Sequence, residues 1–190
     1  MLRLYRSGEI KLFSHYIPSI VPNFPSSYPF KQISYLFDEE SLHPKFIYVG
    51  IINEHRGMLE LFEAWKNVTQ VFPNAELILV GRSNLDIPAE ITHLEGQWLD
   101  VATSLSGAWA GISFIKRTNP TTDYPLLSFP TKIGEYAALG LPVICNLTPI
   151  HSEFLEDSGV FLQEISVEEM TSAFIDFIRN EQKRAKLKQI

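Results

Sequence analysis

The chain has 190 residues, of which 45% are hydrophobic and 20% charged, as in an ordinary soluble domain with its own core. The formal net charge of −6 argues against a sequence-independent nucleic-acid binder, because such proteins need a basic face to displace counterions. A single cysteine, Cys145, excludes an intramolecular disulfide and a cysteine-based zinc site, and it suits the reducing cytoplasm, where we expect the protein to be.

Residues 1–44 differ in composition from the rest of the chain. Five prolines lie there among serines and aromatic residues, without a steady hydrophobic period. We interpret the segment as a linker or peripheral structure, and a short strand at residues 17–21 is compatible with the same pattern. No apolar run here or further along has the length of a signal peptide or a membrane span.

From residue 45 onward, short apolar runs alternate with amphipathic helical periods. We expect strands at residues 46–49, 76–80, 91–94, 109–115, 141–146 and 160–162. We expect helices after the first strand, at residues 98–106 and 131–139, and after the last strand. The alternation predicts one α/β domain over residues 45–190, with a Rossmann-like parallel sheet and helices on both of its faces.

Two of the expected helices have clear signals at their ends. The first has Asn53 as its expected N-cap, and its apolar face consists of Met58, Leu61, Phe62, Trp65 and Val68. The last begins with a capping box from Ser166 to Glu169. Near its C-terminus, where the helix dipole favours cations, it carries Lys183, Arg184, Lys186 and Lys188.

The ends of the strands indicate where a ligand would bind. Parallel sheets of this kind hold their ligands beyond the carboxyl ends of the strands. The loops of interest therefore follow Gly50, Gly81, Gly96, Ile115 and Asn146. The most informative stretch of sequence runs over residues 126–146, LLSFPTKIGEYAALGLPVICN.

Lys132 stands at an unfavourable place in that stretch. Pro130 marks a helix start, so Lys132 falls in the first turn, where free amides and the helix dipole already favour an anion. The placement costs up to about 1 kcal/mol unless something negative is bound. A phosphate would remove this cost, because the amides, the dipole and the ammonium group would all point at it.

Glu135 lies three residues further on, on the same face of the helix as Lys132. A carboxylate accepts hydrogen bonds from two vicinal hydroxyls, such as those of ribose. The two side chains together would suit a nucleotide. A surface ion pair between them explains the spacing equally well.

The same stretch resembles the C-terminal signature of the group 1 glycosyltransferases, which have the GT-B fold. The form P-x-K-x-x-E-Y-x-A-x-G-x-P-V-I is matched by Pro130, Lys132, Glu135, Tyr136, Ala138, Gly140, Pro142, Val143 and Ile144. The resemblance implies that Glu135 binds the nucleotide ribose. It also implies that the start of the helix binds the diphosphate of the donor.

Other stretches extend the resemblance. FIYVGIINEHRG at residues 46–57 is similar to the family's first strand and loop, and Arg56 stands where the family has a diphosphate-binding cation. A solvated helix arginine is the structural alternative, although guanidinium forks suit phosphate oxygens. The tripeptide that ends at Gly81 is similar to the end of the family's second strand, and a glycine there would let the backbone approach the nucleotide. The tripeptide that ends at Gly96 is similar to the loop after the third strand, which in the family contacts the base through backbone atoms. V-P-N at residues 21–23 resembles the junction between the two GT-B domains.

The resemblance implies the C-terminal, donor-binding domain of a GT-B enzyme. Such an enzyme transfers a hexose from a UDP- or GDP-linked sugar to a hydroxyl in polysaccharide or glycoconjugate synthesis, retaining the anomeric configuration and using no bound metal or other cofactor. The implied catalytic residues are Arg56, Lys132 and Glu135. The implied nucleotide contacts are Gly50, Gly81, Gly96, Ser128, Lys132 and Glu135. Because little sequence precedes residues 21–23, we expect the acceptor domain to be missing or supplied by a partner. Any contact with a membrane would also be made through this partner.

Two positions depart from the family pattern. Leu127 stands where many members have a carboxylate that faces the transferred sugar, and Ile51 stands where an arginine is common. Lys116 and Arg117 could supply charge instead, but a solvated loop pair explains them better. Two alternatives to a transferase therefore stay open: a non-catalytic subunit that binds a nucleotide sugar, and a fragment of a GT-B epimerase or phosphorylase.

The five histidines show no metal-ligand spacing, so we expect no metal site. His93 lies in a strand pattern, and we interpret it as structural. His151 follows a strand at the ligand-binding end of the sheet, and we interpret it as a loop feature rather than a general base. His55, next to Arg56, could contact a phosphate.

Overall fold

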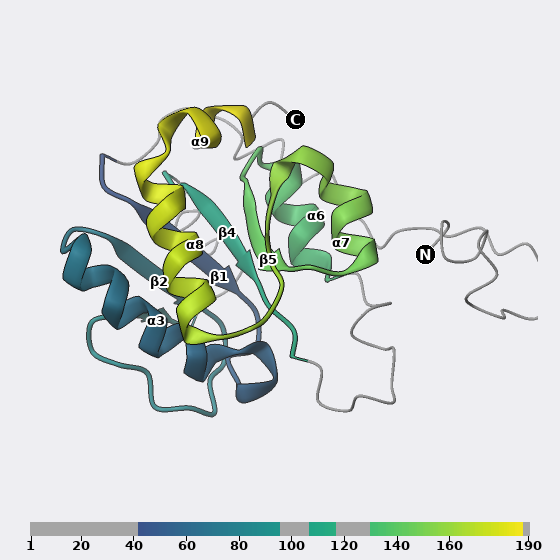
Figure 1. Ribbon diagram of the computed structural model, residues 1–190. Coiled ribbons are helices and arrows are strands. Elements are labelled where there is room, and N and C mark those ends of the chain that lie inside the picture. Colours follow the sequence, from purple (N-terminus) through teal and green to yellow (C-terminus); the bar gives the residue numbers. More distant parts are fainter. Residues whose placement is uncertain (1–41, 96–106, 117–129, 188–190) are drawn as a thin grey trace, which may run out of the picture.

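The computed structural model describes residues 42–95, 107–116 and 130–187 (Figure 1). Within these ranges the chain forms a six-stranded sheet with the order β3-β2-β1-β4-β5-β6, in which all neighbouring strands are parallel. The strands are β1 (Lys45–Val49), β2 (Glu76–Val80), β3 (Thr92–Leu94), β4 (Ala110–Ser113), β5 (Val143–Asn146) and β6 (Gly159–Leu162). The predicted parallel α/β sheet is confirmed.

Helices cover both faces of the sheet, as the sequence predicts. They are η2 (Glu54–Arg56), α3 (Met58–Val71), α6 (Thr131–Ala138), α7 (Pro149–Leu155), η3 (Glu156–Ser158), α8 (Val167–Arg179) and α9 (Glu181–Leu187). One hydrophobic cluster lies between the sheet and α3 and α8, which run side by side in Figure 1. A second cluster lies between the sheet and α6 and α7. In the described part of the chain, no helix is long and apolar enough to cross a bilayer.

Strand β1 contributes side chains to both clusters, because successive residues of a strand point to opposite faces. Phe46 and Tyr48 belong to the cluster under α3 and α8, and Ile47 belongs to the cluster under α6. Three aromatic rings of the helices pack edge-on against Phe46 at centroid distances of 5.0 to 5.7 Å, namely Trp65, Phe174 and Phe177. The interpretation of Trp65 as a core residue is confirmed.

The helix after β1 begins later than the N-cap prediction places it. Asn53 precedes the short helix η2 and makes no capping hydrogen bond, whereas Gly57 is the N-cap of α3. Gly57 has a φ of 65°, and a Cβ there would lie 2.6 Å from the Ile165 side chain, so the turn between η2 and α3 requires a glycine. Asn53 as the N-cap of α3 is therefore wrong. The predicted apolar face is buried as expected.

Half of the predicted capping box at α8 is confirmed. The Ser166 hydroxyl accepts a hydrogen bond from the backbone N–H of Glu169 at 3.3 Å. The Glu169 carboxylate does not return a bond to Ser166; it accepts hydrogen bonds from the backbone N–H groups of Gln163 and Glu164. The carboxylate therefore fixes the chain before the helix rather than the cap residue itself.

The C-terminal helix is divided in two, although the sequence predicts one continuous helix. The break falls at Asn180, whose side chain accepts a hydrogen bond from the backbone N–H of Lys183 and so begins α9. Arg184 then donates hydrogen bonds to the carbonyl oxygens of Phe177 and Ile178 in the last turn of α8. The predicted cation thus reaches the end of α8 from a separate helix.

Strands β1 and β4 are neighbours at the point where the strand order reverses. From β1 the chain moves outward to β2 and β3, and from β4 it moves outward to β5 and β6. Ligands of such sheets bind beside this point, at the carboxyl ends of the strands. The described elements that meet there are the loop after β1, the end of β4 and the N-terminus of α6 (Figure 1).

Some predictions lie outside the described residues. These include the helix at residues 98–106, the strand at residues 17–21 and the junction at residues 21–23. The domain start at residue 45 coincides with the first residue of β1, but the division at residues 44 and 45 stays a prediction.

Candidate functional site

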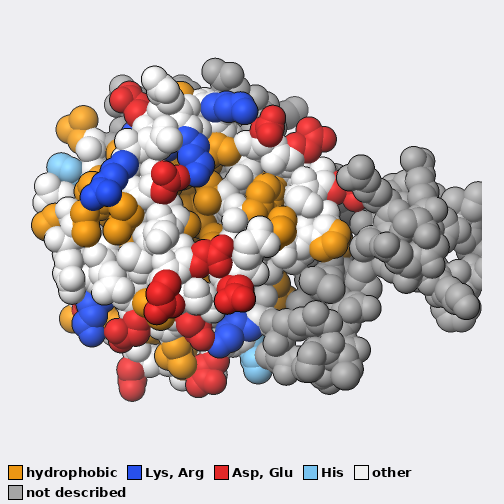
Figure 2. All heavy atoms as spheres, viewed as in Figure 1, with side chains coloured by type: hydrophobic (Ala, Val, Ile, Leu, Met, Phe, Trp, Pro, Cys, Tyr) orange, Lys and Arg blue, Asp and Glu red, His pale blue; other side chains and the backbone are white. Residues whose placement is uncertain are grey.

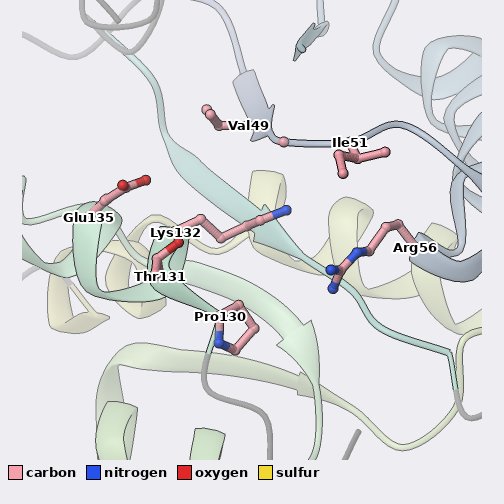
Figure 3. A pocket seen from close by; sticks show the side chains of 8 residues that line it. Val49, Ile51, Arg56, Pro130, Thr131, Lys132 and Glu135 are labelled. Atoms are coloured by element: carbon pink, nitrogen blue, oxygen red, sulfur yellow. The ribbon is translucent and has the colours of Figure 1, made fainter. Parts of the chain in front are cut away.

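A pocket of about 360 Å³ opens at the carboxyl end of β1, where the loop after this strand meets α6 (Figure 3). It is lined by Val49, Gly50, Ile51, Arg56, Pro130, Thr131, Lys132 and Glu135. The fold thus brings together four predicted site residues, namely Gly50, Arg56, Lys132 and Glu135, from two segments about 75 residues apart. The volume is within the range of small-molecule sites in proteins.

Lys132 is the unusual residue of this pocket. It lies in the first turn of α6, is only 9% exposed, and its Nζ lies 3.7 Å from the centroid of the Tyr48 ring. Burial, and secondly the charge of Arg56, hold the pKa of Lys132 well below its ordinary value of 10.5, and the charge of Glu135 opposes this shift. An ammonium group in this position lacks the compensation that buried charges usually have.

Lys132 and Glu135 do not form the ion pair that their spacing allows. Figure 3 shows the Lys132 ammonium directed toward Arg56 and away from the Glu135 carboxylate. Within the described part of the chain, the ion pairs join other side chains: Lys66 with Glu63, Lys116 with Glu60, and Lys183 with Asp176. The two cations of the pocket therefore face each other without a described carboxylate between them.

The N-terminus of α6 adds to this positive potential. Pro130 is its N-cap residue, and its side chain accepts no hydrogen bond from the first amides of the helix. Free amides and the helix dipole together carry about half a positive charge at a helix N-terminus. The dipole, Lys132 and the half-buried Arg56 converge on one pocket, which is an arrangement suited to a multiply charged anion.

Gly50 makes room for the lysine. Its φ is 137°, and a Cβ at this residue would lie 3.0 Å from the Lys132 Nζ. Gly81 does not line the pocket. It has a φ of 136°, and a Cβ there would lie 2.1 Å from the carbonyl oxygen of Gly50, so its missing side chain lets the loop after β1 close against the loop after β2. The predicted approach of Gly81 to the nucleotide stays a prediction.

Glu135 occupies the other side of the pocket, one turn along α6 from Lys132 (Figure 3). It is half-buried, and this burial raises its pKa above the ordinary value, while the charge of Lys132 acts in the opposite direction. Its oxygens are available as acceptors, since the described residues offer them no ion pair. The pocket therefore combines a cationic half with a half that accepts hydrogen bonds from hydroxyls.

Tyr136 fixes α6 against the two central strands. Its hydroxyl accepts a hydrogen bond from the backbone N–H of Val49 at 3.0 Å and donates to the carbonyl oxygen of Ile112 at 3.4 Å. Its fully buried ring lies where a Cβ of Gly111 would be, at 2.4 Å. In the sequence, Tyr136 stands out only as a residue of the motif, without a role of its own. The structure shows that it positions the helix that carries Lys132 and Glu135.

The short helix η2, which carries Arg56, is held by the segment that follows β4. The backbone N–H of Lys116 donates to the carbonyl oxygen of His55 at 2.9 Å, and the Lys116 ammonium forms an ion pair with Glu60 at 2.5 Å. Lys116 does not line the pocket, so it does not replace a donor-site cation; it is paired rather than simply solvated. His55 is exposed and likewise does not line the pocket.

The structure settles two other histidine predictions. His93 is structural as predicted, because its Nε2 lies 2.7 Å from the carbonyl oxygen of Gly81. His151 as a loop feature is wrong: it lies in α7, which the sequence analysis did not predict, and it is fully buried. Its Nδ1 lies 2.8 Å from the carbonyl oxygen of Asn146, and burial lowers its pKa. Thr148 caps α7, and this threonine before a proline is the signal that could have revealed the helix.

Several predicted site positions lie outside the described residues, namely Gly96, Arg117, Leu127 and Ser128. Their roles stay predictions. Ile51, which replaces a common arginine of the family, lies at the pocket and is 57% exposed. No group of three or more potential metal ligands occurs in the part of the chain that the structure describes.

Residues 43–180 match the family described as "Glycosyl transferases group 1", which is more than half of the chain. The chain belongs to this family. A comparison of the sequence with curated proteins gives no match. The fold of the described residues is that of the C-terminal domain of GT-B glycosyltransferases, as the solved structures show.

Three solved structures illustrate this likeness. The C-terminal domain of the group 1 glycosyltransferase LpcC from Francisella tularensis gives a TM-score of 0.59 at 14% identity, with 87% of this chain and 90% of that chain covered. WaaG, a glycosyltransferase involved in lipopolysaccharide biosynthesis, gives a TM-score of 0.58 at 16% identity, with 90% of this chain and 46% of that chain covered. Anabaena Alr3699/HepE, solved in complex with UDP and glucose, gives a TM-score of 0.61 at 15% identity, with 87% of this chain and 46% of that chain covered. The chain therefore spans about half the length of WaaG and HepE.

Proposed function

We propose that this chain is the donor-binding part of a glycosyltransferase that transfers a hexose from a UDP- or GDP-linked sugar to a hydroxyl, in polysaccharide or glycoconjugate synthesis. The observation that carries the proposal is the buried Lys132 ammonium, which faces Arg56 at the N-terminus of α6 with no described carboxylate beside it. A diphosphate supplies the negative charge that this group of cations lacks.

The chemistry required of the protein is mainly electrostatic. The bond between the anomeric carbon and the diphosphate breaks, and the diphosphate leaves with the electron pair. The oxygen of an acceptor hydroxyl forms the new bond to the sugar, and its proton passes to the departing diphosphate. Arg56 and Lys132 would stabilise the charge on the departing diphosphate, because fixed cations in a half-buried site act without reorganising water. Glu135 would accept hydrogen bonds from the ribose hydroxyls, on the opposite side of the pocket.

The nucleotide and the acceptor are also part of the proposal. The UDP and glucose present in the HepE complex support a uridine nucleotide as the first ligand to test. An acceptor would have to be bound by residues beyond the described ranges or by a second chain. In either case the sugar would face the carboxyl ends of β1 and β4, beside the reversal of the strand order.

Calorimetric titration of the full chain with UDP, GDP and UDP-glucose tests the proposal. Lys132→Met should weaken nucleotide binding about 10- to 100-fold, because a charge-assisted contact to phosphate is lost. Glu135→Gln should weaken UDP more than inorganic pyrophosphate, which has no ribose. Lys66→Met is the matched control, since Lys66 is exposed and pairs with Glu63 away from the pocket. A wild-type chain that binds neither UDP nor GDP at millimolar concentration would overturn the proposal.

A subunit that binds a nucleotide sugar without transferring it is a second candidate. Leu127 favours it, because a leucine cannot serve as the carboxylate that many family members place near the transferred sugar. The two candidates differ in turnover. Release of UDP from UDP-glucose by the purified chain, accelerated by an acceptor, would support the transferase and contradict the binding subunit.

A further inference from the structure

Tyr48 lies beneath the candidate site, although it does not line the pocket. It is fully buried in β1, and its ring belongs to the cluster under α3 and α8. Lys132 comes from α6, which covers the opposite face of the sheet. The lysine side chain therefore passes over the end of β1, where Gly50 has no Cβ to obstruct it, and reaches the Tyr48 ring.

Two contacts join Tyr48 to the pocket. The Lys132 Nζ lies 3.7 Å from the centroid of the ring, within the range in which a cation is attracted to the face of an aromatic ring. The Tyr48 hydroxyl donates a hydrogen bond of 2.7 Å to the carbonyl oxygen of Ile51. One side chain thus contacts both the cation of α6 and the loop that forms the opposite wall of the pocket.

A neutral ring suits this place better than a carboxylate would. A carboxylate beside Lys132 would neutralise the ammonium group and repel an incoming phosphate. An aromatic face offsets part of the cost of burying the ammonium group, and the full positive charge remains available to a ligand. The lysine is also held in one place before the ligand arrives, so less side-chain freedom is lost on binding.

We propose that Tyr48 is a positioning residue of the donor site, which holds the Lys132 ammonium on its ring face and the Gly50–Ile51 turn through its hydroxyl. The inference rests on the proposed function, since the ligand it prepares for is the donor diphosphate. Burial and the charge of Arg56 lower the pKa of Lys132. The ring acts against both effects, because it stabilises the charged form. A weaker ring should therefore lower the pKa of Lys132 further.

Graded fluorination of the ring tests this inference in the full chain. Residue 48 is replaced by phenylalanine and by mono-, di- and trifluorophenylalanine, which keep the shape of the ring and progressively weaken its negative face. The pKa of Lys132 is followed by NMR of ¹³Cε-labelled lysine without ligand, with the resonance assigned by Lys132→Arg. From phenylalanine to trifluorophenylalanine we expect the pKa to fall by about one unit, which corresponds to a tenfold change in the protonation equilibrium.

UDP affinity provides the second readout. At a pH above the pKa of Lys132, the UDP affinity should fall from variant to variant together with this pKa. At a pH well below this pKa, the affinity should be the same in every variant, because the lysine is charged in all of them. The same substitutions at Phe174, a buried ring of α8 that packs against Phe46, should change neither quantity. Tyr48→Phe alone tests the hydroxyl and should weaken binding by no more than about threefold, since it removes one hydrogen bond and keeps the ring.

The outcomes separate the inference from the proposed function. A pKa of Lys132 that stays constant across the folded variants would overturn the positioning role, whether or not nucleotide binds. A pKa that changes while the UDP affinity above it stays constant would also overturn the role. If the variants show the expected pKa series but the wild-type chain binds no nucleotide, the proposed function is contradicted and the contact between Tyr48 and Lys132 is still established.

Discussion

Lys132 destabilises the ligand-free protein while it prepares the site for a ligand. Its pKa in the folded chain lies well below 10.5 because of burial and the charge of Arg56. The unfolded chain, in which lysine keeps its ordinary pKa, therefore binds more protons between the two values. The free energy of unfolding consequently rises with pH in that window, and the cost of the buried ammonium is greatest below the folded-state pKa.

Lys132→Met should stabilise the ligand-free protein, by about 1–2 kcal/mol near neutral pH, because a buried charge is replaced by a flexible apolar side chain. The gain should shrink as the pH approaches 10.5, where the wild-type lysine is increasingly neutral in both states. Denaturant unfolding of both proteins at several pH values measures the difference. Lys66→Met should change stability by less than about 0.5 kcal/mol. A marked loss of stability in Lys132→Met would contradict the argument.

At the scale of elements, the position of α6 depends on the contact between Tyr136 and Gly111. The ring of Tyr136 occupies the space in which a Cβ of Gly111 would lie, at 2.4 Å, and it is fully buried. Its hydroxyl also accepts the hydrogen bond from Val49 at the end of β1. A displacement of this ring would therefore move both walls of the pocket.

Gly111→Ala should destabilise the protein by about 1–3 kcal/mol, because the new methyl group overpacks a fully buried site. It should also weaken UDP binding, since α6 carries Lys132 and Glu135. Gly159→Ala in β6 is the matched control. A Cβ there would also lie 2.4 Å from a ring atom, but this atom is the far end of Phe161, which is only partly buried and has room to rotate. Denaturant unfolding and calorimetry compare the two, and equal losses would show that the Tyr136 contact is unimportant.

The sequence predicted the elements better than the contacts between them. Hydrophobic periodicity located the strands and α3, because buried positions recur once per turn of a helix and at every second residue of a strand. Lys132 located the pocket, because a cation in the first turn of a helix opposes the helix dipole. This conflict is visible within a single helix turn. The contact between Tyr48 and Lys132 was missed, because residues 84 positions apart meet only once the sheet has formed. The division of the last helix was missed for another reason: its signal, the Asn180 cap of α9, is local but lies inside an otherwise continuous helical pattern.

At the scale of the whole molecule, an acidic protein presents a cationic pocket. The net charge is −6, and Asp and Glu side chains gather toward the start of α8 on the face shown in Figure 2. Away from the pocket, described lysines such as Lys116 and Lys183 are paired with carboxylates. The cations of the pocket differ from these lysines in having no paired carboxylate among the described residues, and at physiological salt their attraction for an anion should act over about one Debye length of roughly 8 Å.

Binding of a diphosphate should also change the number of protons that the whole molecule carries. A bound diphosphate favours the charged form of Lys132, so it raises the pKa of this lysine from the low value of the free protein. Binding of UDP-glucose, which has no group that titrates near neutral pH, should therefore take up as much as about one proton between the two pKa values. Its affinity should fall as the pH rises through the pKa of Lys132 in the free protein, by about tenfold per pH unit.

Calorimetry in buffers of different ionisation enthalpy counts these protons directly. Lys132→Met should show no uptake assigned to this site and a nearly constant, weaker affinity over the same pH range. Lys66→Met should retain the uptake of the wild type. Proton release on binding would mean that the diphosphate does not lie against this ammonium group. An uptake in Lys132→Met as large as that of the wild type would mean the same, since the uptake would then come from another group of the pocket such as Glu135.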